Sequence, residues 1–246
     1  MSDEFINDRR PWPLPADTWV MFQRWDRLLF AHWPVPYEAL RPLVPESLKL
    51  DQFDGSAWIG IVPFEVTGAY IRGLRGLPLA SDFPEINVRT YVTVQDKPGV
   101  YFFSLDAGSA LAVAGARLLF RLPYFYSKLR IGAEGATVKY ESERDHPDAP
   151  NASFTASYRP VGDVFEAAPG SIEYFFVERY CLYTVDRLKR IYRAEIQHRP
   201  WPLQPAEAVI ERNTMAAAAG VTLPDAAPLL SYAQSQPTRI WPLRRA

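Results

Sequence analysis

Hydrophobic and polar residues alternate along much of the chain, which is the pattern of β-strands. The segment 83–92 shows the alternation most clearly. Because successive side chains of a strand point to opposite faces, one face would be mainly aliphatic. The other face would carry an acid, an amide, a cation and a phenol in a row: Glu85, Asn87, Arg89 and Tyr91. Such a row either faces water or lines an interior, where unpaired polar groups are costly and usually serve a function.

Further segments with strand character extend over most of the chain. We expect strands over 25–33, 57–66, 100–106, 136–141, 153–159, 179–185 and 190–198. Polar turns between them predict three hairpins, which join 83–92 to 100–106, 136–141 to 153–159, and 179–185 to 190–198. The 23 prolines and 13 glycines also break the chain into short segments, so the pattern predicts a mainly β protein.

Helical patterns are few and short. Ser109 can cap a helix that continues to Arg121 with an apolar stripe, and Pro123 then ends it. Other helical segments are expected at 36–43, as a single turn, at 171–178, and from Pro205 through the alanines to Gly220. The stretch 71–82 is predicted to be a loop, and the proline-rich residues 1–15 are predicted to lie across the surface.

Composition narrows the classes of function. The 246 residues are 48% hydrophobic and 14% aromatic, which suffices for a buried core, and no linker divides them, so we expect a single domain over residues 1–246. With a net charge of −1 and no basic run, neither nucleic acid nor an anionic membrane is expected as a partner. No segment resembles a signal peptide or a membrane span.

Cysteine and histidine usage points to a cytoplasmic protein that needs no metal or other cofactor. Cys181 is the lone cysteine and has no partner for an internal disulfide, which fits a reducing compartment. The three histidines are far apart in the sequence and form no zinc-binding motif. A homo-oligomer is compatible with the sequence.

A second group of candidate residues follows the predicted helix. The segment 122–129 is rich in aromatic residues, among them Tyr124, and carries a single lysine, Lys128. A lysine in an apolar pocket loses its charge and becomes an amine that can form a Schiff base with a carbonyl compound. The alternative is a surface lysine with its ammonium group in water. Arg117, on the helix itself, either points into a cavity or pins the helix to an acidic residue.

A third group lies on the last predicted hairpin. Arg179 and Tyr183 share one face of its first strand, so they could line the same cavity as Arg89. His198 could act as a general acid or base, since its reference pKa lies near neutrality, and Trp201 could form part of a binding wall. The alternative for His198 is a structural hydrogen bond to a backbone carbonyl.

The order of several motifs resembles the YqjF-like family of uncharacterised bacterial proteins. The resemblance covers nearly the whole chain and rests on Leu-Leu-Phe-Ala-His-Trp (28–33), Asp-Gln-Phe-Asp-Gly-Ser-Ala-Trp (51–58), Glu-Ile-Asn-Val-Arg-Thr-Tyr-Val (85–92), Gly-Val-Tyr-Phe-Phe-Ser-Leu-Asp-Ala (99–107), Leu-Pro-Tyr-Phe (122–125), Glu-Arg-Tyr-Cys-Leu-Tyr (178–183) and His-Arg-Pro-Trp (198–201).

That family is similar, more remotely, to acetoacetate decarboxylase, whose active site lies inside an antiparallel β-barrel. The resemblance implies an α+β, mainly β fold, an antiparallel barrel with two or three flanking helices, in which the row at Glu85 faces inward. In the decarboxylase two adjacent lysines follow Gly-Tyr-Pro, and the first forms the Schiff base. Aligned without gaps, that pair falls on Ser127 and Lys128, while Glu85 corresponds to an acidic residue of the decarboxylase site.

Three functions remain open on the sequence. The first is an enzyme acting on a small keto acid or other carbonyl or carboxylate compound, with Arg89 or Arg179 holding the anion and Glu85, Lys128 and His198 as candidate catalytic groups. The second is a protein that binds an anionic metabolite in the same lumen without catalysis, with Tyr124, Phe125, Tyr126 and Trp201 as its walls. Asn87, Tyr91 and Tyr183 are further candidate contacts of a ligand. The third, a purely structural or interaction module, predicts no sizeable cavity.

Overall fold

The computed structural model describes residues 5, 9–74, 82–147 and 149–246. In these residues thirteen strands form one sheet. They are β1 (Met21–Val35), β2 (Lys49–Leu50), β3 (Ala57–Ile71), β4 (Phe83–Val94), β5 (Lys97–Ala107), β6 (Tyr124–Glu134), β7 (Thr137–Arg144), β8 (Ala152–Pro160), β9 (Cys181–Val185), β10 (Ile191–Gln197), β11 (Leu203–Asn213), β12 (Leu229–Ile240) and β13 (Arg244–Arg245). The helices are α1 (Tyr37–Leu40), the 3-10 helix η1 (Arg41–Leu43), α2 (Ala110–Phe120), α3 (Ile172–Val177) and α4 (Met215–Ala218).

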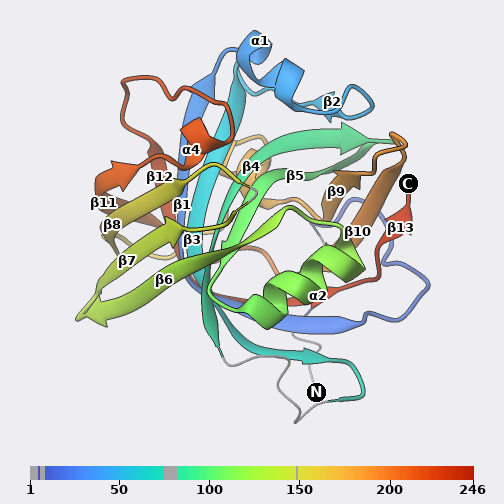
Figure 1. The fold of residues 1–246 in the computed structure, drawn as a ribbon, viewed down its shortest axis with the longest axis horizontal. Helices are drawn as coiled ribbons and strands as arrows, with labels where there is room; N and C mark the ends of the chain where they lie inside the picture. The colour runs from blue at the N-terminus through green and yellow to red at the C-terminus, as the bar shows by residue number, and fades with distance from the viewer. Residues whose placement is uncertain (1–4, 6–8, 75–81, 148) are drawn as a thin grey trace.

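The sheet closes on itself in a ring. Its strands follow the order β13-β10-β9-β5-β6-β7-β8-β11-β12-β1-β3-β4-β2, and the additional pairings β10–β12 and β5–β4 complete the closure (Figure 1). Most neighbours are antiparallel, but β5 runs parallel to both β6 and β9. The predicted mainly β barrel with few short helices is therefore confirmed, with two parallel pairings that the sequence did not indicate.

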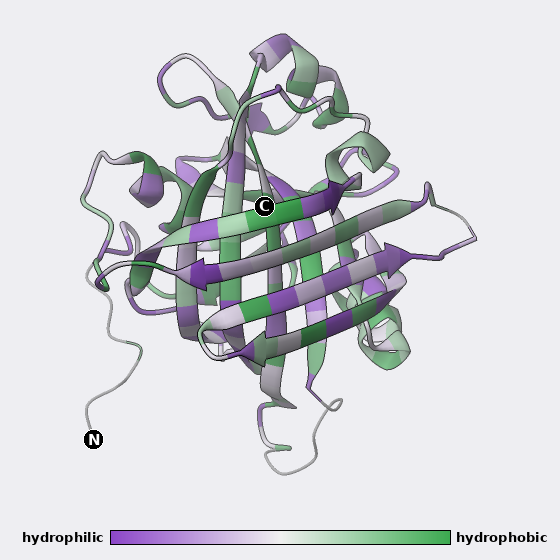
Figure 2. Ribbon diagram, turned by 90° about the vertical axis from the view of Figure 1, so that its left-hand side faces the viewer, coloured by the Kyte–Doolittle hydropathy of each residue, from purple (hydrophilic) through white to green (hydrophobic). Residues whose placement is uncertain are grey.

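The pairings form two closed circuits of strands that share β1, β3, β4, β5 and β12. The first four of these shared strands have buried residues on both of their faces. On one face aliphatic residues such as Ile61 and Val88 pack against Phe154 and Tyr158 of β8 in a large hydrophobic core. The opposite face, with Phe30 and Phe64, belongs to a second cluster under α2 and α3. Figure 2 shows the corresponding alternation of hydrophilic and hydrophobic residues along the strands. The alternation of β4 thus directs one set of its side chains into the packed core and the other set into a second interior, the space lined by the second cluster.

The predicted hairpins are present in the structure. β4 and β5 pair antiparallel, as do β7 with β8 and β9 with β10. The β4–β5 turn places Gln95 and Asp96 at φ of 50° and 57°, the left-handed conformation that a tight hairpin turn requires at both positions. Helix α2 begins after Ser109, whose Oγ accepts a hydrogen bond from the Ala112 amide at 3.2 Å. Ser171 caps α3 in the same way.

The helix predicted from Pro205 to Gly220 is wrong. Residues 203–213 form strand β11, paired with β8, and only the short α4 follows. The reason is the period of burial, because Ala206, Ala208 and Ile210 alternate with exposed residues and pack onto the large core. Strands β6 and β12 were not predicted. The loop expected at 71–82 begins where β3 ends at Ile71, and 75–81 lie outside the described residues.

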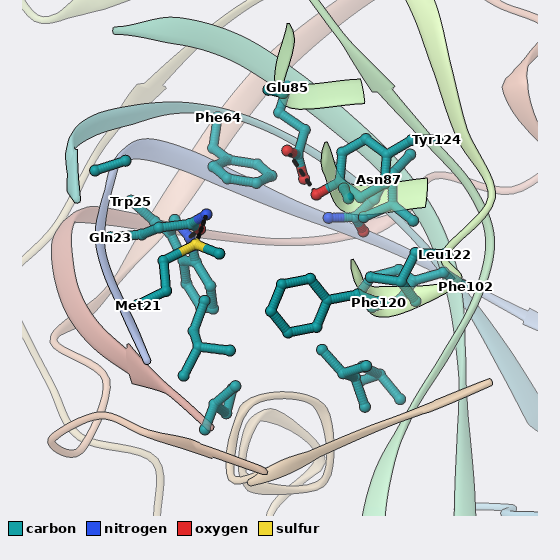
Figure 3. Close-up of a pocket in the computed structure, with 18 of the residues that line it drawn as sticks. Met21, Gln23, Trp25, Phe64, Glu85, Asn87, Phe102, Phe120, Leu122 and Tyr124 are labelled. Carbon is teal, nitrogen blue, oxygen red and sulfur yellow. Dashed lines mark hydrogen bonds between the residues drawn. The ribbon is translucent and has the colours of Figure 1, made fainter. Parts of the chain in front are cut away.

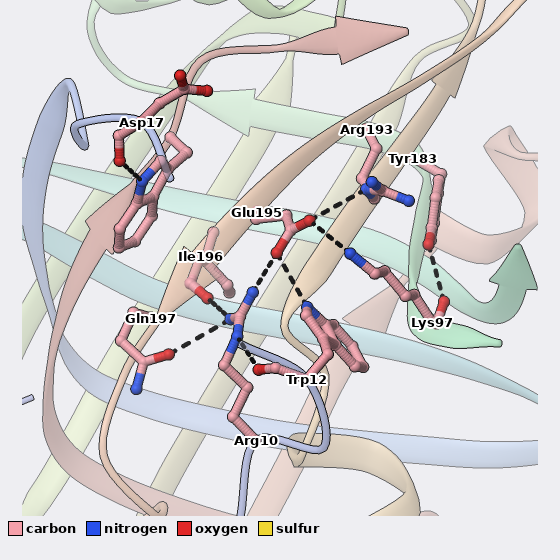
Figure 4. A network of polar contacts seen from close by, with 10 residues as sticks. Arg10, Trp12, Asp17, Lys97, Tyr183, Arg193, Glu195, Ile196 and Gln197 are labelled. Carbon is pink, nitrogen blue, oxygen red and sulfur yellow. Dashed lines mark hydrogen bonds and ion pairs between the residues drawn. The ribbon is translucent and has the colours of Figure 1, made fainter. Parts of the chain in front are cut away.

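The described part of the segment 1–15 is anchored to β10 (Figure 4). Arg10 is buried, forms an ion pair with Glu195 and donates a hydrogen bond to the Ile196 carbonyl at 2.7 Å. The Trp12 indole donates to the same Glu195 carboxylate at 2.9 Å, and Lys97 contacts it at 3.1 Å. Residues 1–4 and 6–8 lie outside the described part of the chain.

Candidate functional site

The second interior contains a cavity of about 290 Å³. Its walls come from the shared strands, from β9, β10 and β12, and from helices α2 and α3, and most of the lining side chains are apolar (Figure 3). A cavity with apolar walls and a few polar groups is the usual form of a small-molecule site. Its presence is contrary to what a purely structural module predicts.

The polar groups of the cavity come mainly from β4. Glu85, Asn87 and Arg89 all line it, as the alternation of that strand requires. Tyr124, at the start of β6, donates a hydrogen bond from its hydroxyl to Glu85 Oε2 at 3.0 Å. In Figure 3 Glu85, Asn87 and Tyr124 lie together on one side of the cavity.

The Glu85 carboxyl is mainly protonated at pH 7, with a minor ionised fraction. Burial raises its pKa to about 8, and the nearby Asp106 contributes in the same direction. The hydrogen bond from Tyr124 and the charge of Arg89 oppose this rise without cancelling it. A carboxyl group that keeps its proton in this way can donate it to a ligand, and with a pKa near neutrality it can also take a proton back.

Arg89 has no counter-ion among the described residues. Its Nε is buried without a hydrogen-bond partner, and its guanidinium lies over the ring of Phe30, 5.5 Å from the centroid. Burial lowers the pKa of Arg89, and electrostatic interaction with the ionisable groups Tyr91 and Glu85 acts in the opposite direction. The Oδ1 atom of Asn87 is also buried and unpaired. The cavity therefore holds one uncompensated cation beside an unused hydrogen-bond acceptor.

A second arginine of the cavity, Arg179, has a counter-ion within the protein. Its Nη1 contacts the Asp51 carboxylate at 2.6 Å, and its Nε donates to the Phe175 carbonyl at 2.7 Å. His198 also lines the cavity, and burial lowers its pKa to about 4, so the imidazole is neutral. Its Nδ1 donates to the Arg199 carbonyl at 2.8 Å, which is the structural hydrogen bond considered as an alternative role.

Tyr91 lies on the same face of β4 but behind the cavity wall. Its hydroxyl is hydrogen-bonded to His32 Nε2, and the His32 ring stacks on Phe176 at 3.7 Å between centroids. Burial raises the pKa of Tyr91 to about 12. His32, Gly60 and Arg89 are in register across β1, β3 and β4. A Cβ on Gly60 would lie 2.8 Å from the His32 ring, so this glycine makes room for the pair of side chains.

Three predicted site residues lie away from the cavity. Lys128 is on the outer face of β6, its side chain 67% exposed, and pairs with Asp145 at 3.3 Å. Arg117 is exposed on α2 and contacts His146 at 3.2 Å. Tyr183 is buried in the other core and donates to the Lys97 carbonyl at 2.8 Å. Ser127, beside Lys128, points inward and donates to Asp106 at 2.7 Å.

Sequence reasoning missed most of the apolar wall. Trp201 was expected and lines the cavity, where it stacks on Trp25 at 6.2 Å between centroids. The wall residues not expected include Trp25, Phe64, Phe102, Leu182 and one face of α2. The apolar stripe of α2 was the available signal, but nothing in the sequence indicates which surface that stripe covers.

No helix in the described part of the chain combines the length and the apolar character that a membrane span requires. Within the same residues, no cluster of three or more histidine, cysteine, aspartate or glutamate side chains is placed to hold a metal ion.

The amino-acid sequence is similar to that of an uncharacterised protein family over most of the chain. Residues 22–237 match DUF2071, a family model described as uncharacterized conserved protein. The chain is 48% identical over 232 residues to uncharacterized protein YqjF of Bacillus subtilis, covering 94% of this chain and 95% of that protein.

The solved structures of similar fold include acetoacetate decarboxylase-like enzymes. One, from Sphingomonas wittichii RW1, superposes with a TM-score of 0.61 at 13% identity over 96% of this chain and 97% of its own. The enduracididine biosynthesis enzyme MppR, complexed with pyruvate, superposes with a TM-score of 0.63 at 10% identity over 96% and 93% of the two chains.

Proposed function

The chain belongs to the DUF2071 family, and on the geometry of its cavity we propose that it binds a small carboxylate of the keto-acid class at Arg89 and transfers protons through Glu85. The observation that carries the proposal is the uncompensated Arg89 guanidinium in an apolar cavity. A buried charge without a partner is strongly disfavoured, so an anion that supplies the missing charge would bind well.

The groups beside Arg89 on β4 determine how a bound keto acid would react. A carboxylate on Arg89 would place the adjacent carbonyl group of a keto acid near Asn87 and Glu85, which follow on the same face of β4. The ionised form of Glu85 would take a proton from the carbon next to the carbonyl. The C–H bond breaks, an O–H bond forms on Glu85, and the charge moves to the enolate oxygen, where Arg89 stabilises it. Return of the proton regenerates the keto acid.

This chemistry needs no imine. Among the described residues, no lysine lines the cavity, and Lys128 lies in solvent with Asp145 as its partner. The position that aligns with the Schiff-base lysine is Ser127, which is hydrogen-bonded to Asp106. The fold shared with acetoacetate decarboxylase-like enzymes and with MppR, which is seen complexed with pyruvate, supports a keto acid as ligand by analogy alone.

The test is hydrogen exchange at the carbon next to the carbonyl. 2-Oxobutanoate is incubated with the protein in D2O, and loss of the proton signal is followed by NMR. We expect exchange above the buffer rate with the wild type, loss of exchange with retained binding in Glu85→Gln, and loss of both in Arg89→Met. Lys128→Met is the control and should exchange at the wild-type rate. A Lys128→Met variant without exchange, or an Arg89→Met variant that still exchanges, would refute the assignment.

A second function, binding without catalysis, is favoured by the scarcity of proton-transfer groups in the cavity. Glu85 is the one carboxyl group that lines it in the described residues, and Arg179 and His198 are held by structural contacts. This function predicts that 2-oxobutanoate raises the melting temperature of the protein through Arg89 while its protons do not exchange.

A further inference from the structure

The cavity is strongly polarised along its length. Glu85, Asn87 and Tyr124 gather on one side, whereas Met21 and Phe120 lie farther from them; the polar side chain beside Met21 is Gln23, whose amide donates to the Met21 sulfur (Figure 3). Helix α2 contributes six lining residues, all of them without a polar side-chain group: Leu111, Ala112, Gly115, Ala116, Leu119 and Phe120. The part of the cavity under α2 therefore presents no charged or hydrogen-bonding side chain from this helix.

The same helix marks the mouth of the cavity. Leu111 and Leu119 line the cavity and yet are 68% and 59% exposed to solvent. Glu85 and Asn87 are each only 4% exposed, so they lie at the closed end. A ligand that enters beside α2 would thus place its polar head deep in the cavity and leave any remaining length between apolar walls.

The space exceeds what a short keto acid fills. Taking the volume of a water molecule, about 30 Å³, for each non-hydrogen atom, the 290 Å³ cavity holds roughly ten such atoms. Pyruvate has only six. Some of the surplus space lies beside α2, because a Cβ added to Gly115 would meet nothing within 4 Å.

We propose that the ligand is an amphipathic monocarboxylate whose apolar tail of several carbon atoms runs from Arg89 to the mouth under α2. The inference rests on the proposed function, because it takes Arg89 as the site of the carboxylate. Phe102, Phe120 and the small residues of α2 bind the tail by excluding water from it. The short keto acid used above is then a minimal ligand that occupies the closed end alone.

The experiment is a calorimetric titration with straight-chain monocarboxylates from butanoate to decanoate. Each added methylene buried in the cavity should tighten binding about fourfold, until the tail reaches the mouth and the gain stops. Arg89→Met should weaken binding of every member. These acids carry no keto group, so the series tests the binding geometry independently of proton transfer.

Two matched variants of α2 locate the tail. Gly115→Leu fills the space under the helix and should weaken octanoate binding at least tenfold while leaving butanoate binding unchanged. Ala114→Leu adds the same side chain to the exposed face of the same helix and should change neither. Gly115→Leu favours the helix, since leucine has a higher helix propensity than glycine, and Ala114→Leu is nearly neutral; circular dichroism checks the fold of both.

The outcomes separate the two claims. Equal affinity for all chain lengths, still dependent on Arg89, would overturn the tail site and leave the proposed carboxylate site intact. Absence of binding at every length would overturn both. Octanoate binding that survives both Arg89→Met and Gly115→Leu would show nonspecific apolar adsorption and would also overturn the tail site.

Discussion

Two arginines in one cavity have opposite roles because of their partners. Arg179 is buried with the Asp51 carboxylate at 2.6 Å and so is part of the structure. Arg89 has no carboxylate within ion-pair distance among the described residues, and Glu85, the acid on the same face of its own strand, mostly keeps its proton at pH 7. A largely enclosed cation without a partner lowers stability, and its retention is typical of a functional site.

Replacing each arginine with methionine should therefore change stability in opposite directions. We expect Arg89→Met to raise the free energy of unfolding by about 1 kcal/mol, because methionine has a similar volume and removes an unpaired charge from a half-buried position. Arg179→Met should lower it by about 3 kcal/mol, because Asp51 is left without its partner. Urea unfolding of the three proteins measures both changes. Destabilisation by Arg89→Met as large as that by Arg179→Met would show that Arg89 has an internal partner.

Glu85 should make stability depend on pH. The native pKa of about 8 is raised above the ordinary value of 4.5, so the native state binds more protons than the unfolded state between these values. The free energy of unfolding should then fall as pH rises from about 5 to 8 and become level above 8. The glutamine in Glu85→Gln does not titrate, so this variant should lack the pH-dependent contribution of Glu85. The difference in the free energy of unfolding between wild type and variant therefore reports Glu85 alone, because the buried histidines contribute equally to both proteins. A pH-independent difference would contradict a raised pKa.

At the scale of elements, strand β4 needs a glycine on its neighbour β3. Gly60 lies between His32 and Arg89 in register, and a Cβ there would be 2.8 Å from the His32 ring and 3.3 Å from Arg89 Cγ. The His32 ring cannot retreat easily because it is stacked on Phe176 and bonded to Tyr91. The glycine thus fixes where both side chains lie.

Gly60→Ala should test this packing. We expect a loss of about 2 kcal/mol in the free energy of unfolding, since overpacking displaces the His32 ring, together with weaker carboxylate binding as Arg89 moves. Gly132→Ala is the control, because Gly132 is also a strand residue and a Cβ there would meet nothing within 4 Å. If both substitutions lowered the free energy of unfolding equally, the loss would come from replacing a strand glycine in general and not from the contact with His32.

Alternation and helix capping, which depend only on residues close together in the sequence, correctly predicted β4 and the start of α2. The alternation of β4 put Glu85, Asn87 and Arg89 on one face, and Ser109 began α2 where its side chain caps the helix. The alanines after Pro205 resemble a helix by composition, yet pairing with β8 makes them a strand. Lys128 follows the same rule of alternation, because the strand that turns Ser127 inward turns its neighbour outward. Long-range pairing, which no local pattern reports, decided that 203–213 form a strand and which face of β6 points inward.

At the scale of the whole molecule, a network around Glu195 fastens the N-terminal segment to the sheet. Glu195 on β10 contacts Arg10, Lys97 of β5 and Arg193, so one carboxylate joins three parts of the chain (Figure 4). β10 also pairs with β12 to close the ring. The network therefore supports the side of the ring that carries Ile196 and His198 into the cavity.

Glu195→Gln should loosen this side. With Arg10, Lys97 and Arg193 left without their shared carboxylate, we expect a loss of about 3 kcal/mol in the free energy of unfolding and faster proteolysis within residues 1–20. Glu207→Gln, which breaks the exposed pair with Arg159, is the control and should cost less than about 1 kcal/mol. If Glu195→Gln behaved like this control, the network would not hold the segment.

The central claim is that a neutral Glu85 leaves Arg89 available to an external anion. It is tested most directly by the affinity for butanoate, which stays ionised throughout, measured by calorimetry from pH 6 to pH 9. We predict constant affinity up to about pH 7, a steep fall above pH 8 as the Glu85 carboxylate forms and competes for Arg89, and no such fall in Glu85→Gln. Affinity that is independent of pH in the wild type, or unchanged by Arg89→Met, would contradict the account.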